Sequence, residues 1–306
     1  MDTSSPLPSK SPDSGLRDLL TVLPQYLTPQ LLLSSMMHRF ATVRWAPFKD
    51  AQIRWFARRY RIDLGEALEP DPRRYPHLNA FFTRPLRPGA RPLPDAGADI
   101  VSPADGVVST IGHAAGATAL QAKGRHYTLG ELLGAEADAT PYLGGSYLTV
   151  YLSPRDYHRV HMPAAGALRR LRYIPGRLFS VNARTSRLVP RLFARNERVV
   201  AHFETDVGQM AVVLVGALLV GGIETVWTGP ITPPHGQPAF LRTYPDGAQH
   251  LRRGEEMGRF NMGSTVIVLL EPGRVDWLDG TDVGARLRVG TAVGRCSDPE
   301  RSAAQR

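Results

Sequence analysis

The sequence predicts an α+β protein, in which N-terminal amphipathic helices are followed by a β-rich domain. Residues 19–37 carry no charged side chain, and the segment after them repeats apolar residues at helical spacing. From about residue 98 onward the chain changes to short runs of β-type residues separated by Gly and Pro, which is the pattern of strands and turns. We therefore expect a disordered arm over residues 1–15, a helical region over 16–95 and a β-rich domain over 96–306.

The composition is that of a folded globular chain. Of the 306 residues, 42% are apolar and 21% are charged, a balance that excludes a largely disordered protein. Cys296 is the single cysteine, so no intramolecular disulfide forms and the cysteine count gives no support for secretion. The first 15 residues are rich in Ser, Pro and Asp and lack the basic start, apolar core and cleavage site of a secretory signal.

The uncharged segment 19–37 is a poor candidate for a membrane span. Pro24 and Pro29 interrupt it, and a spanning helix needs about 20 predominantly apolar residues. We expect two short helices lying at an interface, the second with Leu33 and Met37 on one face.

The next segment combines basic and aromatic residues. Between Arg39 and Arg61 the chain has seven Arg or Lys residues and one acid, within a net charge of +9. Pro47 suits the first turn of a helix, and Ile53, Phe56 and Tyr60 then share one face. Core packing would explain this stripe, but the arginines favour a face resting on anionic lipid. No helix-turn-helix or zinc pattern accompanies the charge, so nucleic acid is not the expected partner.

The rest of the chain is predicted to form a proline-punctuated covering segment, 70–94, followed by strands. The expected strands include the following runs: Val107 to Ile111, Tyr147 to Leu152, Met210 to Val220 and Val266 to Leu270. The apolar run from Ala211 to Ile223 is too short to span a bilayer and fits buried strands better.

Four stretches hold residues that could carry chemistry. Asp105 lies in a Ser-Pro-Ala-Asp-Gly turn, which alone indicates ordinary turn chemistry. His158 and His161 follow a strand, but no further ligand stands at metal-site spacing, so we expect no metal. Arg177 lies in the loop 175–182, whose amide groups could grip a headgroup. Ser264 follows Gly263 and opens a strand.

Asp105, His161 and Ser264 could form a triad in which the acid orients an imidazole that activates the hydroxyl. A serine esterase is therefore one interpretation, although Ser264 lacks the Gly-x-Ser-x-Gly elbow of a common hydrolase class. The other interpretation is that Ser264 attacks its own backbone. Gly263 carries the carbonyl that would be attacked, and its small size and free backbone suit a strained, exposed peptide bond.

Six stretches of the chain form a specific combination: Asn79-Ala80-Phe81-Phe82-Thr83-Arg84-Pro85-Leu86, Ser102-Pro103-Ala104-Asp105-Gly106, Tyr157-His158-Arg159-Val160-His161-Met162-Pro163, Asn196-Glu197-Arg198, Val213-Leu214-Val215-Gly216-Ala217, and Gly258-Arg259-Phe260 to Gly263-Ser264-Thr265. Together they resemble the phosphatidylserine decarboxylase family, the pyruvoyl-dependent membrane enzymes of bacteria and mitochondria. The resemblance covers nearly the whole chain after the first 15 residues. Met262 stands where the family usually has leucine, a volume-conserving difference.

The resemblance implies a proenzyme. In it, Asp105 orients His161, which takes the proton from Ser264, and Ser264 attacks the Gly263 carbonyl. Cleavage gives a large chain (1–263) and a small chain (264–306) that stay together as a heterodimer, and pairing of two such heterodimers into a dimer is left open. Ser264 becomes a pyruvoyl group, the covalent cofactor, and His158 supports the later chemistry.

The resemblance also implies a lyase of phospholipid biosynthesis. The serine amine of phosphatidylserine forms a Schiff base with the pyruvoyl carbonyl, carbon dioxide leaves, and phosphatidylethanolamine is released. Arg84, Arg159 and Arg177 are candidates for substrate binding. Residues 16–95 would bind an anionic membrane surface, which gives a peripheral protein on the cytoplasmic face of a bacterial cell membrane. Two competing interpretations remain beside the serine esterase: a pyruvoyl decarboxylase of a soluble amino acid and a non-catalytic membrane-binding module.

Overall fold

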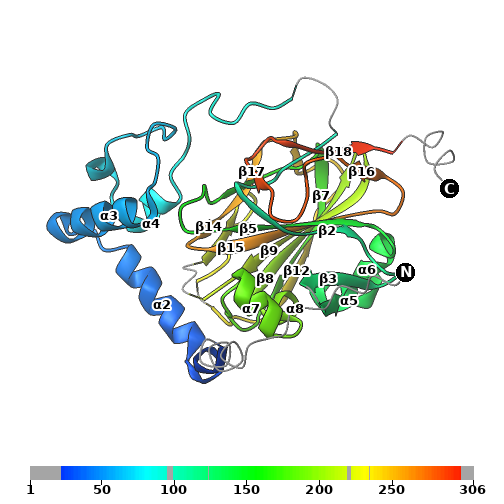
Figure 1. Ribbon diagram of the computed structural model, residues 1–306, viewed down its shortest axis with the longest axis horizontal. Coiled ribbons are helices and arrows are strands. Elements are labelled where there is room, and N and C mark those ends of the chain that lie inside the picture. The colour runs from blue at the N-terminus through cyan, green and yellow to red at the C-terminus, as the bar shows by residue number, and fades with distance from the viewer. Residues whose placement is uncertain (1–21, 95–98, 123, 219–221, 234, 298–306) are drawn as a thin grey trace, which may run out of the picture.

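The computed structural model describes residues 22–94, 99–122, 124–218, 222–233 and 235–297. Helices form the N-terminal part and extend to one side of a β-rich body (Figure 1), which confirms the predicted α+β class. The disordered arm expected over residues 1–15 lies outside the described residues. Among the described helices, none has the length and apolar character needed to cross a membrane.

The predicted pair of short N-terminal helices is confirmed. Residues 22–27 are helical, and α2 (Gln30–Ala41) begins directly after Pro29. Next comes α3 (Ala46–Tyr60), which has proline in its first turn and ends where Arg61 adopts a left-handed conformation, a common way to close a helix. Two short elements complete this region: η1 (Pro72–Arg74) and α4 (Leu78–Phe82).

The expectation that the Ile53, Phe56 and Tyr60 face rests on lipid is wrong. Ile53 and Phe56 are buried, and Phe56 packs edge to face against Phe82 with ring centroids 5.8 Å apart. This face of α3 covers α4, where burial of the apolar side chains and edge-to-face ring contacts stabilise the packing. The large α3 side chains that remain exposed are those of Trp55 and the arginines.

All paired strands of the described residues run antiparallel. The largest sheet has nine strands in the order β12-β7-β8-β9-β15-β5-β2-β17, with β13 paired to β7. Its strands are β2 (Gly106–His113), β5 (Ser146–Leu152), β7 (Gly166–Ile174), β8 (Arg198–Thr205), β9 (Gly208–Gly216), β12 (Phe240–Thr243), β13 (His250–Leu251), β15 (Ser264–Leu270) and β17 (Arg286–Leu287). The four predicted runs are confirmed as strands, although β9 ends at Gly216 and not at residue 220.

Smaller sheets flank this one. A four-stranded sheet contains β6 (Arg159–His161), β10 (Gly222–Thr225), β11 (Gly229–Pro230) and β14 (Glu256–Asn261). A three-stranded sheet contains β1 (Ile100–Val101), β16 (Val275–Trp277) and β18 (Ala292–Cys296), and a two-stranded one contains β3 (Thr118–Ala122) and β4 (Arg125–Thr128).

The nine-stranded sheet has a core on each face, and β15 contributes to both. Val266 and Val268 join the core that includes the four-stranded sheet, whereas Ile267 joins the other core, on the face covered by short helices. This alternation follows from the two-residue period of a strand. The helices are α5 (Leu129–Leu133), α6 (Glu136–Ala139), η2 (Thr140–Tyr142), α7 (Ala183–Leu188) and α8 (Leu192–Arg195).

The loop 175–182 serves the N-terminal helices and does not present free amides for a headgroup. The Leu178 amide donates to Gln30 at 2.8 Å and the Ser180 amide donates to Gln25 at 2.9 Å. Arg177 donates to the Tyr26 carbonyl at 3.1 Å. The expected headgroup-binding role of this loop is therefore wrong for those two amides, because the helices already use them.

Candidate functional site

Ser264 lies at the first position of β15 and is fully buried. Its Oγ has no hydrogen-bond partner among the described residues, a property it shares with the next residue, Thr265. The two residues before it have positive φ, +83° at Met262 and +65° at Gly263. Glycine adopts such a φ freely, but a side chain there costs about 1–2 kcal/mol. The backbone leading into the Gly263–Ser264 bond is therefore strained.

The neighbours of β15 hold Ser264 in place on both sides. Ser264 pairs with Leu152 of β5 and with Gly216 of β9, and the ladders continue along the buried strand. A break before Ser264 would therefore leave β15 anchored in the centre of the sheet.

His158 is the fully buried imidazole close to this segment. The Phe260 amide donates to its carbonyl at 3.0 Å, four residues before Ser264. Its ring lies 3.9 Å from that of Phe82, centroid to centroid, and Phe82 belongs to the cluster against which Met262 packs. The chain thus places His158 beside the strained turn.

The protonation of His158 follows from its surroundings. Its Nδ1 lies 2.8 Å from the Asp156 carbonyl oxygen, which can only accept, so Nδ1 carries the proton. Burial lowers the pKa of His158 to about 3, which keeps the ring neutral at ordinary pH. Its Nε2 is buried and has no partner among the described residues. A neutral imidazole with a free Nε2 lone pair is what a general base requires.

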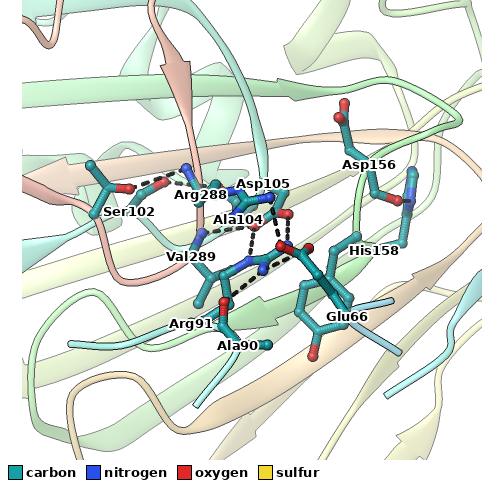
Figure 2. A network of polar contacts seen from close by, with 12 residues as sticks. Glu66, Ala90, Arg91, Ser102, Ala104, Asp105, Asp156, His158, Arg288 and Val289 are labelled. Atoms are coloured by element: carbon teal, nitrogen blue, oxygen red, sulfur yellow. Dashed lines mark hydrogen bonds and ion pairs between the residues drawn. The ribbon is translucent and has the colours of Figure 1, made fainter. Parts of the chain in front are cut away.

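Asp105 precedes β2, as predicted, and its carboxylate is already bound. Arg91 donates to it from Nε at 3.0 Å and from Nη2 at 2.5 Å, and the Val289 amide donates at 2.8 Å. Arg91 also pairs with Glu66 at 3.0 Å, and Figure 2 shows the resulting network. The covering segment 70–94 is thereby tied to the β-rich body through Arg91.

His161 is engaged at both ring nitrogens. Its Nδ1 lies 2.8 Å from the Gly254 carbonyl and its Nε2 lies 3.1 Å from the Tyr157 hydroxyl. Burial lowers its pKa below the ordinary value. Among the described residues, no hydrogen bond joins His161 to Asp105 or to Ser264. The structure therefore does not assemble the triad expected from the sequence. The Asp105 carboxylate is hydrogen-bonded to Arg91, and the His161 ring is hydrogen-bonded to Gly254 and Tyr157.

Asp156 was not singled out from the sequence, although it stands two residues before His158. Its carbonyl orients the His158 ring, while its carboxylate accepts from the Ser153 hydroxyl at 2.6 Å and from Arg286 at 2.8 Å. Figure 2 shows Asp156 and His158 side by side, apart from the Asp105 network. The sequence signal was an acid close to a histidine in one loop, and only the fold shows that the main-chain oxygen makes the contact.

The three arginines proposed for substrate binding do not lie together. Arg159 donates to the Thr83 carbonyl and pairs with Glu256 at 2.7 Å, and Arg177 contacts the N-terminal helices. Arg84 is buried, and its Nε and Nη1 have no partner among the described residues. It lines a cavity of about 340 Å³ that Asp105 also lines.

Strained turn, buried serine and neutral imidazole together form a site of the kind found in enzymes that act on their own backbone. The chain matches the family model described as phosphatidylserine decarboxylase over residues 78–295, and a model described as PSD over residues 20–61.

Similar proteins agree with this match. Phosphatidylserine decarboxylase proenzyme of Pseudomonas aeruginosa (strain LESB58) is 51% identical over 283 residues, which is 91% of this chain and 98% of that protein. The proteins of the same name from Pseudomonas fluorescens (strain Pf0-1) and Pseudomonas putida (strain KT2440 among its designations) are 49% and 50% identical over 91% and 90% of this chain and 98% and 97% of their own lengths. The chain belongs to the phosphatidylserine decarboxylase family.

Proposed function

We propose that this member of the family decarboxylates phosphatidylserine to phosphatidylethanolamine, using a pyruvoyl group made from its own Ser264. The observation that carries the proposal is the buried, unpartnered hydroxyl of Ser264 behind the strained Met262-Gly263 turn. The neighbouring Thr265 hydroxyl is also buried without a partner, but Ser264 alone of the two directly follows the strained turn. The naming of the relatives as proenzymes supports the same conclusion.

The chain itself supplies the groups for cleavage. His158 Nε2 takes the proton of the Ser264 hydroxyl, and Oγ attacks the Gly263 carbonyl carbon. The peptide C–N bond breaks, the proton passes to the Ser264 nitrogen, and an ester joins residues 263 and 264. Loss of the Cα proton then breaks the Cβ–Oγ bond and releases Gly263 as a carboxylate. Hydrolysis of the remaining enamine releases ammonia and leaves pyruvoyl at the start of the small chain.

His158 is a better candidate for the base than His161. His158 has a free Nε2, whereas both ring nitrogens of His161 are bound. Asp105 and Asp156 act as positioning residues in this proposal: Asp105 fastens the covering segment through Arg91, and Asp156 sets the His158 ring.

When present, the pyruvoyl carbonyl supplies the electron sink that decarboxylation needs. The chain residues provide the rest. Apolar core residues of β15 follow the buried Ser264, and an environment of low polarity favours loss of charge from a carboxylate. Arg84 remains a candidate for substrate binding because it has unpaired N–H groups. After cleavage, chains 1–263 and 264–306 stay paired through β15.

The direct test is turnover by the purified, self-cleaved protein on phosphatidylserine vesicles and on free serine. We expect carbon dioxide and phosphatidylethanolamine from the lipid and no product from serine. The reason is that the N-terminal helices bind the membrane in which the lipid lies, whereas free serine is not held there. Turnover of serine at a comparable rate would instead support a pyruvoyl enzyme of soluble amino acids.

The membrane-binding surface in this proposal is α2 and the helical turn before it. Their exposed apolar side chains include Leu27, Leu32 and Met36, of which Leu27 is 78% exposed. Arginines of α3 provide charge for anionic lipid. Such a surface binds peripherally at the membrane–water boundary.

Replacing Leu27 and Leu32 with Glu should weaken binding to anionic vesicles by at least about tenfold, since each change removes apolar contact and adds repulsion. Vesicle co-sedimentation measures this. Val283→Glu is the matched control, because Val283 is 65% exposed on the β-rich body. Equal binding by the double variant and the control would show that α2 does not hold the membrane.

A further inference from the structure

A buried acid–histidine pair lies on the opposite side of Ser264 from β5. The Glu197 carboxylate accepts from the Tyr173 hydroxyl at 2.6 Å and lies 2.7 Å from His235 Nδ1. The side chains of His235 and Glu197 are 0% and 1% exposed. Among the described residues, His235 is the one histidine, lysine or arginine whose side chain lies within 4.0 Å of the Glu197 carboxylate.

The sheet places Glu197 in one row with Ser264. Gly216 pairs directly with Ser264 on one side, and its amide donates to the Glu197 carbonyl at 2.8 Å on the other. Residues directly opposite in an antiparallel pair point to the same face. A β-carbon built on Gly216 would lie 3.9 Å from Glu197 Oε2. The Glu197 carboxylate therefore leans over Gly216, on the face to which the Ser264 side chain points.

The turn that carries His235 also lies against the cleavage segment. Ile223 of β10 donates to the Thr232 hydroxyl at 2.9 Å, and the neighbouring Gly222 pairs with Asn261. The turn before His235 is therefore bonded to β10, which pairs with Asn261, while the His235 ring contacts Glu197, which is bonded to β9 next to Ser264. Its Nε2 is buried and without a partner among the described residues.

The same turn lies beneath the lipid-facing helix. A β-carbon on Gly236 would come within 3.2 Å of Leu31 Cδ1 of α2. Leu32, the next residue of α2, is 60% exposed. The turn that carries His235 therefore lies between α2 and the elements that flank residues 261–264.

We propose that His235 is a specificity-determining residue that donates from Nε2 to the phosphodiester of the lipid headgroup. The carboxylate of Glu197 can only accept, so it fixes one proton on Nδ1. The proposed bond to the phosphodiester uses the imidazolium form, in which Nε2 carries the second proton. Phosphodiester oxygens accept charge-assisted hydrogen bonds well. The substrate carboxylate is the poorer partner, because a cation held against it would stabilise the ground state and oppose loss of carbon dioxide.

The proposal rests on the proposed decarboxylation, and His235→Asn tests it. The Asn amide can still donate to Glu197, so the buried acid keeps a partner. We expect normal self-cleavage, KM for short-chain phosphatidylserine raised about 10- to 100-fold, as for loss of a hydrogen bond to a charged group, and kcat changed by less than about threefold. His235→Arg restores a cationic donor and should recover most of the KM. Inhibition by glycerophosphate should be weaker in the His235→Asn variant than in the wild-type protein, and it should be restored in the His235→Arg variant.

His202→Asn is the matched control. His202 is also buried, and its Nε2 lies 3.9 Å from the carboxylate of Asp138. It belongs to β8, the strand that begins directly after Glu197, but its side chain points to the other face of the sheet. Its KM should stay at the wild-type value. An unchanged KM in His235→Asn, or a KM equally raised in His235→Arg, overturns the role of His235. If His235→Asn does not fold, Glu197→Gln replaces it with the same expected rise. A wild-type protein that cleaves but leaves phosphatidylserine unchanged contradicts the proposed function instead.

Discussion

Ser264→Ala should give a single chain that neither cleaves nor decarboxylates. Alanine lacks the oxygen that attacks Gly263, and no other group in the described structure could replace it at that bond. The fold should persist, because Ser264 Oγ makes no hydrogen bond that the substitution would remove, and losing an unsatisfied hydroxyl costs little. Denaturing electrophoresis of the purified variant measures cleavage, and lipid turnover measures activity.

Thr265→Val is the control for this substitution. Thr265 is the next residue, is equally buried and also has an unpartnered hydroxyl, but the strand period directs it to the other face of the sheet. We expect normal cleavage in Thr265→Val. Cleavage of Ser264→Ala at the same bond would mean that residue 264 is not the nucleophile.

His158→Asn should slow self-cleavage by about 10² to 10⁴-fold, the usual loss when a general base is removed. The Asn amide can replace the Nδ1–H donor to Asp156, so the loop keeps its hydrogen bond while the basic nitrogen is lost. The appearance of the small chain over time after synthesis, followed by electrophoresis, gives the rate. His161→Asn should cleave faster than His158→Asn, because His161 contacts Gly254 and Tyr157 and not the serine.

The reverse order of these two rates would support the relay through Asp105 and His161 that the sequence favoured.

The pH dependence of self-cleavage offers an independent check on the role of His158. Because burial lowers the pKa of His158 to about 3, the ring stays unprotonated well below the ordinary histidine value. Wild-type cleavage should therefore show no acid limb near pH 6.5, whereas a base with an unperturbed pKa would lose activity there.

The same shift affects stability. Between the unfolded pKa of about 6.5 and the folded value of about 3, the unfolded chain binds the proton that native His158 excludes. The free energy of unfolding therefore falls as the pH falls through this window, by up to about 1.4 kcal/mol per pH unit from this residue. Above pH 6.5 this contribution is constant.

Local pattern was enough to predict much of the fold. Proline placed the start of α3, and runs of apolar residues placed β5, β9 and β15, because both signals depend on nearby residues. The partner of an apolar stripe is a tertiary property. The Ile53 and Phe56 face could therefore be recognised, but its burial against Phe82 could not.

The site divides in the same way. Ser264, Gly263, Asp105, His158 and His161 were predicted as site residues from motifs and from the family resemblance that those motifs carry. The contacts of these residues could not be predicted from the sequence. Arg91 lies 14 residues from Asp105 along the chain, and nothing in the spacing indicates that its guanidinium binds the Asp105 carboxylate. The Glu197–His235 contact joins positions 38 residues apart and depends on the register of β8 and β9, which periodicity alone does not define.

The intact mass of the purified wild-type protein tests the pyruvoyl mechanism most directly. We expect two species, a large chain ending at Gly263 and a small chain of residues 264–306 that is lighter than its serine-started sequence by one molecule of ammonia. Reduction with borohydride should add two hydrogen atoms to the small chain only. A single uncleaved chain that still decarboxylates phosphatidylserine, or a small chain beginning with unmodified serine, would contradict this mechanism.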